Sequence, residues 1–248
     1  MRMTPEVRRH SNLESLSLAA AALVVDLAEV SLQRRGRFTF VLSGGTSPRL
    51  LYELLAQPPF SERMPWSGIY LFWGDERCVP PDHPHSNFGV ARQALLSKVP
   101  IPAVNVYPMS GAAAPPEAAA VQYEESLRAF FQAGRGLRFP VFDLLLLGLG
   151  PDGHTASLFP GDPALEEERR WARAVRVASA SPPVPRITLT LPVINRARTV
   201  LFLVSGAGKK KVLDAILSEP EKAALRYPAA RVKPSGRITW LIDEGMTR

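Results

Sequence analysis

The stretch FDLLLLGLGPDGHTAS, residues 142–157, decides the fold of this 248-residue chain. Its four consecutive leucines, Leu144 to Leu147, predict a short strand that is buried on both faces. Three glycines within six residues then break the strand, and His154 follows them directly. Open α/β sheets build their sites in this way, with a turn and functional side chains at the carboxyl end of a buried strand. The alternative is a tight turn in which His154 only caps a helix.

Other apolar segments of the chain end in the same way, with a glycine beside polar residues. They lie at residues 38–42, 69–73 and 199–204, and they run into Ser43-Gly44-Gly45-Thr46, Gly74-Asp75-Glu76-Arg77 and Ser205 to Lys209. Further strands are predicted near 105–107, 173–177, 187–191 and 238–242, with helices at about 12–35, 88–97, 117–131 and 208–218. This alternation predicts a three-layer α/β/α fold with a mostly parallel, Rossmann-like sheet, in one domain over residues 1–248.

The N-terminal segment has two interpretations. Arg8 and Arg9 precede an apolar run over residues 18–25, as in a signal peptide, but Asp26 and Glu29 interrupt the apolar pattern. We therefore expect an amphipathic helix, which Ser11-Asn12-Leu13-Glu14 opens as a capping box.

Composition narrows the classes of function. The net charge is +7, but the basic residues are scattered and no aromatic residues interleave with them, so we expect no nucleic-acid partner. No uninterrupted apolar run reaches the length of a membrane span, so no membrane partner is expected either. The single cysteine, Cys78, excludes an intrachain disulfide and fits a reducing cytoplasm. We expect a cytoplasmic monomer.

The loop from Ser43 to Thr46 lies between a predicted strand and a predicted helix. Glycine amides, hydroxyl groups and the helix dipole together favour an anion at such a place. It is not a Walker loop, because the Gly-Lys-Ser/Thr ending is missing. The alternative is an ordinary strand-to-helix turn with serine or threonine caps, and the pattern alone does not separate the two.

Residues 148–153 also match the dinucleotide fingerprint G-x-G-x-x-G. That fingerprint requires a long helix directly after it and an acidic residue at the end of a second strand. Here Pro160 and Gly161 end any helix early, so we expect no dinucleotide and no other cofactor. His83 and His85 have no nearby cysteine, and a metal site is not expected there.

In a parallel sheet the carboxyl ends of the strands meet along one edge, so the four polar strand ends should form one site. They would supply an anion cradle, a guanidinium, a neutral base and a lysine, a set that suits a phosphorylated metabolite. His154 has the only ordinary pKa near neutrality among these groups, so it is the expected general base. No G-x-S-x-G elbow is present, which disfavours a serine hydrolase. We expect Cys78 to be buried filler rather than a nucleophile.

Four motifs together resemble the 6-phosphogluconolactonase family over about residues 13–245. They are Ser43 to Thr46, Gly74 to Arg77 with the loop from Pro80 to Asn87, Gly148 to Gly161, and Arg186 to Leu189. The sister family, glucosamine-6-phosphate deaminase, shares the Asp-Gly-His core but differs at Arg77 and after His154. The chain departs from the lactonase pattern at Cys78, His85 and Gly208.

The resemblance implies a deaminase-like fold and the cofactor-free hydrolysis of 6-phospho-D-glucono-1,5-lactone, the second step of the oxidative pentose phosphate pathway. His154 would activate water, Arg77 and amides of the glycine turn would stabilise the oxyanion, Asp152 would orient His154, and Asp75 would bind sugar hydroxyls. Substrate or phosphate would contact Ser43, Gly44, Gly45, Thr46, Gly150, Gly153, Arg186 and Lys209. The alternatives are a deaminase or other sugar-phosphate isomerase, and a non-catalytic sugar-phosphate sensor.

Overall fold

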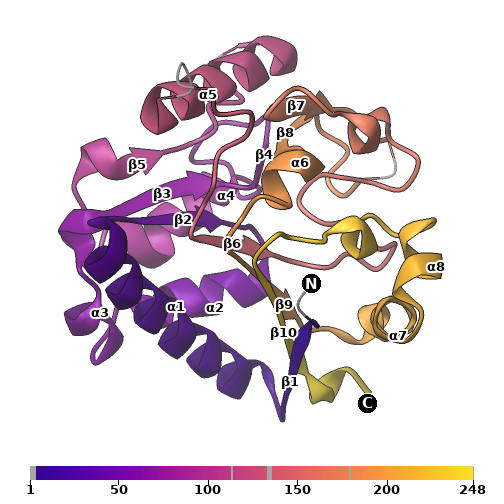
Figure 1. Cartoon of the computed structure of the whole chain (residues 1–248), viewed down its shortest axis with the longest axis horizontal. Coiled ribbons are helices and arrows are strands. Elements are labelled where there is room, and N and C mark those ends of the chain that lie inside the picture. Colours follow the sequence, from indigo (N-terminus) through magenta and orange to yellow (C-terminus); the bar gives the residue numbers. More distant parts are fainter. Residues whose placement is uncertain (1–3, 113, 133–135, 179, 248) are drawn as a thin grey trace.

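A computed structural model describes residues 4–112, 114–132, 136–178 and 180–247 of the chain. Its main sheet has seven strands in the order β1-β10-β9-β6-β2-β3-β5, and all neighbouring strands are parallel (Figure 1). Their bounds are β1 Glu6–His10, β2 Phe38–Leu42, β3 Ile69–Trp73, β5 Val106–Tyr107, β6 Leu144–Leu147, β9 Thr199–Val204 and β10 Arg237–Asp243. The predicted fold class is confirmed.

Helices cover both faces of this sheet (Figure 1). They are α1 Leu13–Arg35, α2 Thr46–Leu55, α3 Phe60–Arg63, α4 Asn87–Ala91, α5 Pro116–Phe131, α6 Leu191–Ile194, α7 Lys210–Ser218 and α8 Pro220–Ala224. The chain moves from β2 to β3 in one direction across the sheet, and from β6 through β9 to β10 in the other. Right-handed crossovers then place the connecting helices on opposite faces. The direction reverses between β2 and β6, so a ligand site is expected outside the carboxyl ends of these two neighbours.

Helix α1 covers the range of the predicted helix and packs against the main sheet, with Leu16, Ala20 and Val24 fully buried. By length and composition alone it could cross a membrane. The capping box is present one residue later than predicted: Asn12 is the N-cap and accepts from the backbone N–H of Ser15, whose hydroxyl lies at the position that we assigned to Glu14.

Strand β1 is an element that sequence patterns missed. Residues Glu6–His10 form an edge strand parallel to β10, with Val7 opposite Trp240. Its residues are exposed or half-buried, because only one neighbour covers an edge strand. The absence of an apolar pattern is therefore what an edge strand produces.

A second sheet of three antiparallel strands was also not predicted. It has the order β4-β8-β7, with β4 Asp75–Arg77, β8 Arg186–Leu189 and β7 Ala172–Val175. The strand predicted near residues 187–191 is β8, and all four of its residues are buried. The predicted helix over 88–97 is α4 followed by a π-type turn over Arg92–Leu96.

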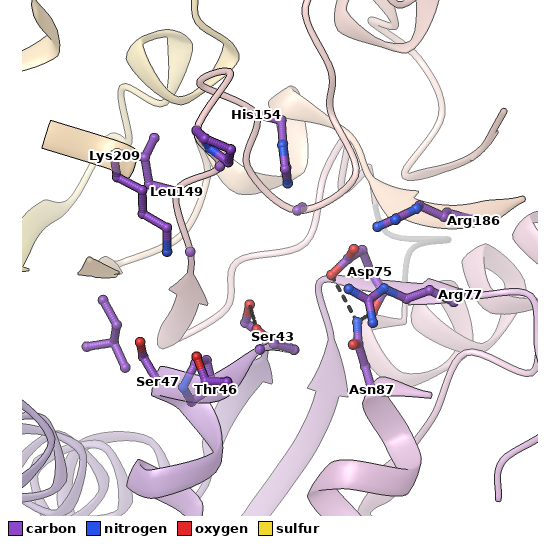
Figure 2. Close-up of a pocket in the computed structure, with 18 residues that line it drawn as sticks. Ser43, Thr46, Ser47, Asp75, Arg77, Asn87, Leu149, His154, Arg186 and Lys209 are labelled. Atoms are coloured by element: carbon purple, nitrogen blue, oxygen red, sulfur yellow. Dashed lines mark hydrogen bonds between the residues drawn. The ribbon is translucent and has the colours of Figure 1, made fainter. Parts of the chain in front are cut away.

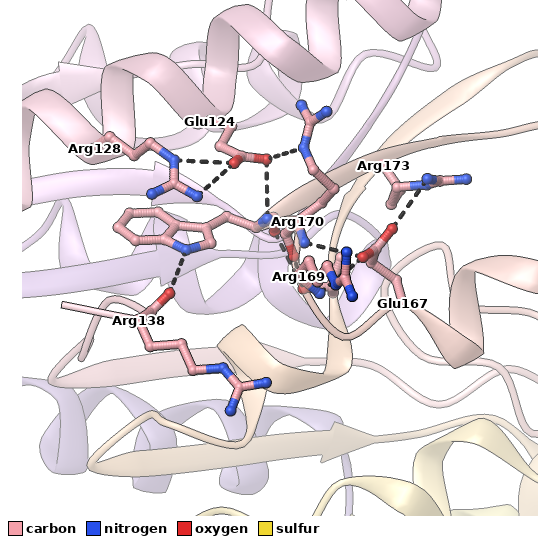
Figure 3. A network of polar contacts seen from close by, with 9 residues as sticks. Glu124, Arg128, Arg138, Glu167, Arg169, Arg170 and Arg173 are labelled. Carbon is pink, nitrogen blue, oxygen red and sulfur yellow. Dashed lines mark hydrogen bonds and ion pairs between the residues drawn. The ribbon is translucent and has the colours of Figure 1, made fainter. Parts of the chain in front are cut away.

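Helix α5 is attached to the second sheet by an ion network around Glu124 (Figure 3). The buried Glu124 carboxylate accepts from Nε and Nη2 of Arg128 at 3.0 and 2.8 Å, from Nε of Arg170 at 2.8 Å and from the backbone N–H of Trp171 at 3.0 Å. Burial alone would raise the pKa of Glu124, but the hydrogen bonds from Arg170 and Arg128 hold it below its ordinary value. The guanidinium of Arg128 also lies 4.5 Å from the centre of the Trp171 ring.

Candidate active site

A cavity of about 250 Å³ opens at the carboxyl ends of β2 and β6, where the strand order reverses. It collects all four predicted strand ends. Figure 2 shows Lys209 on the side of the α2 N-terminus, Arg77 and Arg186 on the opposite side, and His154 between them. The predicted residues that line the cavity are Ser43, Gly44, Gly45, Thr46, Asp75, Arg77, Gly150, His154, Arg186 and Lys209. Asp152 and Gly153 are not among the lining residues.

The loop after β2 presents the first turn of α2 to this cavity. The backbone N–H of Ser43 donates to Tyr52 Oη at 2.9 Å, and Tyr52 Oη donates back to the Ser43 carbonyl at 2.7 Å. This fully buried tyrosine fixes the end of the strand. The next amides include those at the start of α2, which a helix leaves without intrahelical partners. Thr46 and Ser47 begin the helix and line the cavity, so an anion can bind to amides, hydroxyl groups and helix dipole together.

Asp75 is held rigidly on the cavity wall. Its carboxylate accepts from Ser157 Oγ at 2.6 Å and from Asn87 Nδ2 at 3.3 Å, and Asn87 Nδ2 also donates to the Asp75 carbonyl at 2.9 Å. Asn87 reaches this position only because residue 44 is a glycine: a Cβ at Gly44 would lie 1.9 Å from Asn87 Oδ1. Asn87 and Ser157 are functional-site residues that the sequence interpretation missed.

Arg77 and Arg186 face each other across the β4–β8 pair. Like charges at directly opposite positions destabilise an antiparallel sheet. Burial, and then the charge of Arg77, lower the pKa of Arg186. The Nε atoms of both are buried, and neither has a hydrogen-bond partner within the described chain. Arg186, which we expected to contact substrate or phosphate, lines the same cavity as the Ser43–Thr46 loop, and the antiparallel pairing of β4 and β8 places it opposite Arg77.

The remaining contacts of the two guanidiniums are with backbone carbonyls. Nη1 of Arg77 donates to the His85 carbonyl at 2.8 Å, and Nη2 of Arg186 donates to the carbonyls of Ser181 and Pro182 at 2.9 and 3.1 Å. Among the residues that the structure describes, neither arginine forms an ion pair with a carboxylate. The pair is therefore positioned by neutral groups and keeps its charge for an anion.

Lys209 supplies the third cation. It follows β9 and lines the cavity, and no carboxylate pairs with it in the described part of the chain. Burial lowers the pKa of Lys209 because the charged form loses water. An anion bound beside it would offset that loss.

His154 is oriented by Asp152 and Phe159. Nδ1 of His154 lies 2.6 Å from Asp152 Oδ1, and the imidazole ring centre lies 4.5 Å from that of Phe159. Burial acts to raise the pKa of Asp152, but the hydrogen bond and charge of His154 hold it lower than usual. An ionised Asp152 selects the tautomer with the proton on Nδ1, which leaves Nε2 as a free base. Gly150 allows this placement, because a Cβ there would lie 2.1 Å from Nδ1.

Two amides of the glycine turn are already in use. The backbone N–H of Gly150 donates to the His154 carbonyl at 2.8 Å, and that of Gly153 donates to the Gly150 carbonyl at 3.0 Å. The Gly153 carbonyl accepts from the backbone N–H of Ala229. The turn closes on itself to hold His154, so these two amides are used within the turn.

The two remaining polar neighbours have structural roles. Glu76 points away from the cavity and accepts from the backbone amides of Arg77, Asn87 and Phe88, each at 2.7 Å, so it anchors the loop after β4. Burial raises the pKa of Glu76. Burial also raises the pKa of the Cys78 thiol to about 11, which keeps it a thiol rather than a nucleophile.

Comparison with known proteins shows the family of the chain. Residues 11–240 match the family of glucosamine-6-phosphate isomerases and 6-phosphogluconolactonases. The chain is 46% identical to the 6-phosphogluconolactonase of Synechocystis sp. over 242 residues, which cover 98% of this chain and 97% of that one. The structure of 6-phosphogluconolactonase from Trypanosoma cruzi aligns with a TM-score of 0.85 at 32% identity, over 100% of this chain and 97% of that one.

The fold is shared more widely than the sequence. A monomeric glucosamine-6-phosphate deaminase aligns with a TM-score of 0.80 over 98% of both chains, but at 21% identity this is a likeness of fold alone. The match to the family nevertheless covers nearly the whole of this sequence, including every strand end that lines the cavity. The protein therefore belongs to the family of glucosamine-6-phosphate isomerases and 6-phosphogluconolactonases.

Proposed function

We propose that the protein hydrolyses 6-phospho-D-glucono-1,5-lactone to 6-phospho-D-gluconate. One observation carries the proposal: an imidazole held at Nδ1 by Asp152 lines a small cavity together with three cations, and none of the three pairs with a carboxylate among the described residues. A lactone is an activated ester, so its hydrolysis needs a base for water and a stabilised oxyanion. The naming of the full-length relatives as 6-phosphogluconolactonases supports the same activity.

The catalytic step begins at Nε2 of His154. This nitrogen takes a proton from water as the water oxygen bonds to C1 of the lactone. Ionised Asp152 stabilises the imidazolium that forms, through the hydrogen bond at 2.6 Å to Nδ1. When the tetrahedral intermediate breaks its bond from C1 to the ring oxygen, the imidazolium returns the proton to that oxygen. The products are a carboxylic acid, which ionises at neutral pH, and a free hydroxyl group.

The oxyanion lies on the side of Arg77 and Arg186 in this proposal. Both guanidinium groups line the cavity and are held by backbone carbonyls before substrate arrives, and preorganised charges are the most effective at developing charge. Removing one such donor typically costs about 3 kcal/mol in the transition state. This assignment gives Arg77 the role that we expected and gives Arg186 a new one.

The phosphate lies at the N-terminus of α2 in this proposal. The amides and hydroxyl groups of Thr46 and Ser47 face it, and Lys209 lies on the same side of the cavity (Figure 2). Helix N-termini favour phosphate through amides and dipole, and lysine adds a point charge. Asp75, which already accepts from Ser157 and Asn87, keeps lone pairs for sugar hydroxyl groups.

The protein acts as a cytoplasmic monomer in this proposal, without nucleic acid or a membrane. The single cysteine fits a reducing compartment. Light scattering during gel filtration measures the mass, and a dimer would contradict this part of the proposal.

The deciding experiment offers the purified protein two substrates separately. One is the lactone, prepared fresh and corrected for spontaneous opening, and the other is glucosamine 6-phosphate. We expect rapid acid release from the lactone and no ammonia from the amino sugar. Ammonia release without accelerated lactone opening would identify a deaminase, and activity on neither would favour a sensor.

A further inference from the structure

A second, larger cavity lies at the amino ends of the main-sheet strands, opposite the catalytic cavity. Its volume is about 850 Å³, and residues that precede or begin β6, β9 and β10 contribute to its wall. Strand β9 runs from this cavity to the catalytic one, and its six residues span about 20 Å of extended chain. The cavity is thus distinct from the catalytic one. It is lined by five arginines: Arg34, Arg35, Arg196, Arg198 and Arg237.

Two aspartates also line this cavity, and both are committed to other contacts. Asp143 accepts from the backbone N–H and Oγ1 of Thr39, both at 2.9 Å, and pairs with Arg35 at 2.9 Å and Arg198 at 3.3 Å. Asp26 pairs with Arg63, which is not a lining residue. The carboxylates therefore neutralise at most two of the five guanidiniums.

The other three arginines are Arg34, Arg196 and Arg237. Each is exposed, and within the described chain none makes a side-chain hydrogen bond or ion pair. Arg34 stands in the last turn of α1, where a cation complements the helix dipole. That explanation does not extend to Arg196, in the connection after α6, or to Arg237, the first residue of β10. Unpaired like charges in one concavity repel each other, so an anionic occupant would stabilise them.

The rest of the wall indicates what the occupant carries. Leu23, Leu27 and Val30 of α1 contribute an apolar side, and Val30 is 43% exposed. Guanidinium groups bind phosphate as planar forks, and three of them suit a ligand with more than one negative charge. The volume falls within the usual range for small-molecule sites. We propose that this cavity is a second anion-binding site, for an organic diphosphate whose apolar part rests on α1.

The test is calorimetric titration with inorganic pyrophosphate, which probes the charged part of the site alone. The double variant Arg196→Ala, Arg237→Ala removes two spare guanidiniums and leaves the Asp143 contacts intact. The double variant Arg9→Ala, Arg169→Ala removes the same charge elsewhere and serves as its control. The variant Lys209→Ala should weaken anion binding in the catalytic cavity only. Adenosine diphosphate, in a parallel titration, adds a ribose and an aromatic base, whose flat face can rest on apolar side chains, to the same charged group.

We expect two binding events in the unmodified protein. In the double variant Arg196→Ala, Arg237→Ala, one of the two events should become at least tenfold weaker. The other event, which Lys209→Ala weakens, should be unchanged in this double variant. Adenosine diphosphate should bind the second cavity more tightly than pyrophosphate. A single event that Lys209→Ala abolishes would overturn the proposal, as would equal loss in the control. Tighter, Arg196- and Arg237-dependent binding of an acidic peptide or of duplex DNA would also overturn it, because the surface would then serve a macromolecule.

Discussion

Two groups of arginines in this protein have opposite surroundings. Around Glu124, Arg128 and Arg170 both donate to one buried carboxylate, and a tryptophan amide completes the set (Figure 3). In the catalytic cavity, Arg77 and Arg186 lie opposite each other with buried Nε atoms that have no partner in the described chain (Figure 2). The residue type is the same, but only the first group is satisfied within the fold.

The difference separates stability from function. The paired and hydrogen-bonded network around Glu124 helps to hold α5 on the second sheet. Breaking it would leave a buried charge without a partner, which lowers the stability of the fold. An unpaired pair of cations contributes repulsion until an anion arrives, so the fold is less stable than it could be at that place. Changes at the two places should therefore act on different measurements.

The largest effect is expected for His154→Ala. Loss of the general base should lower kcat by about 10²- to 10⁴-fold, because water then loses its proton acceptor. The thermal midpoint should stay close to that of the unmodified protein, since the ring is partly exposed and caps no buried network. Steady-state kinetics on the lactone and calorimetry measure the two quantities. Full activity in the variant would remove His154 from the mechanism.

The next effect is expected for Arg186→Met, which keeps the length of the side chain. A charge-assisted hydrogen bond contributes about 1.5–3 kcal/mol, so kcat/KM should fall roughly 10- to 100-fold. Most of the loss should appear in kcat, because the arginine faces developing charge. Stability should be unchanged or higher, since the repulsion with Arg77 is removed. Arg173→Met, at an exposed ion pair in β7, is the matched control. A change confined to KM would indicate that Arg186 binds the phosphate group of the substrate and not the oxyanion.

A smaller effect is expected for Glu124→Gln, and it should appear in the free energy of unfolding rather than in kcat. The amide keeps the shape of the side chain but loses the charge that three donors share, so unfolding should become about 1–2 kcal/mol easier. Both arginines are partly exposed and can be rehydrated, which limits the loss. At 25 °C the kcat should stay within about twofold, as the network is remote from the cavity. Urea unfolding measures the change, and a large loss of kcat in folded protein would contradict the division.

The smallest effect is the pH dependence of the difference in unfolding free energy between the unmodified protein and Glu124→Gln. The pKa of Glu124 is lower in the folded chain than its ordinary value of 4.5. Its stabilisation is therefore fully present above the unfolded pKa, and it is lost as the pH falls through the lower folded value. We expect the stability gap between the unmodified protein and Glu124→Gln to be constant near pH 7 and to shrink below about pH 4.5. Urea unfolding from pH 7 to pH 3 tests this, and a gap that widens on acidification would contradict it.

Local patterns predicted the main sheet well because its strands are short apolar runs with glycine after them. The same patterns brought Ser43, His154 and Lys209 to one edge, since parallel strands end together. They missed β1, whose charged residues have one neighbour and no apolar face. They also missed the pairing of Arg77 with Arg186, which depends on antiparallel contact between segments about a hundred residues apart. Long-range register of this kind has no local signal.

The roles of single residues were harder to predict than their positions. Gly150 and Gly153 were expected to contact the substrate or its phosphate, but a turn must first satisfy its own backbone, and it uses the amides of both. Asn87 and Ser157 gave no sequence signal beyond lying in the family motifs. Their importance appears only where the two side chains converge on the Asp75 carboxylate.

The contact between Gly44 and Asn87 has a consequence for how this site can evolve. A methyl group at residue 44 would overlap the Asn87 amide, and Asn87 in turn holds Asp75. A substitution at residue 44 is therefore tolerated only after residue 87 has become smaller, and that first change already loosens the carboxylate. The two positions are epistatic, and the order of mutation matters. Directed evolution of this loop toward other sugar phosphates should begin with paired libraries at 44 and 87, because single-site libraries will return the parent glycine.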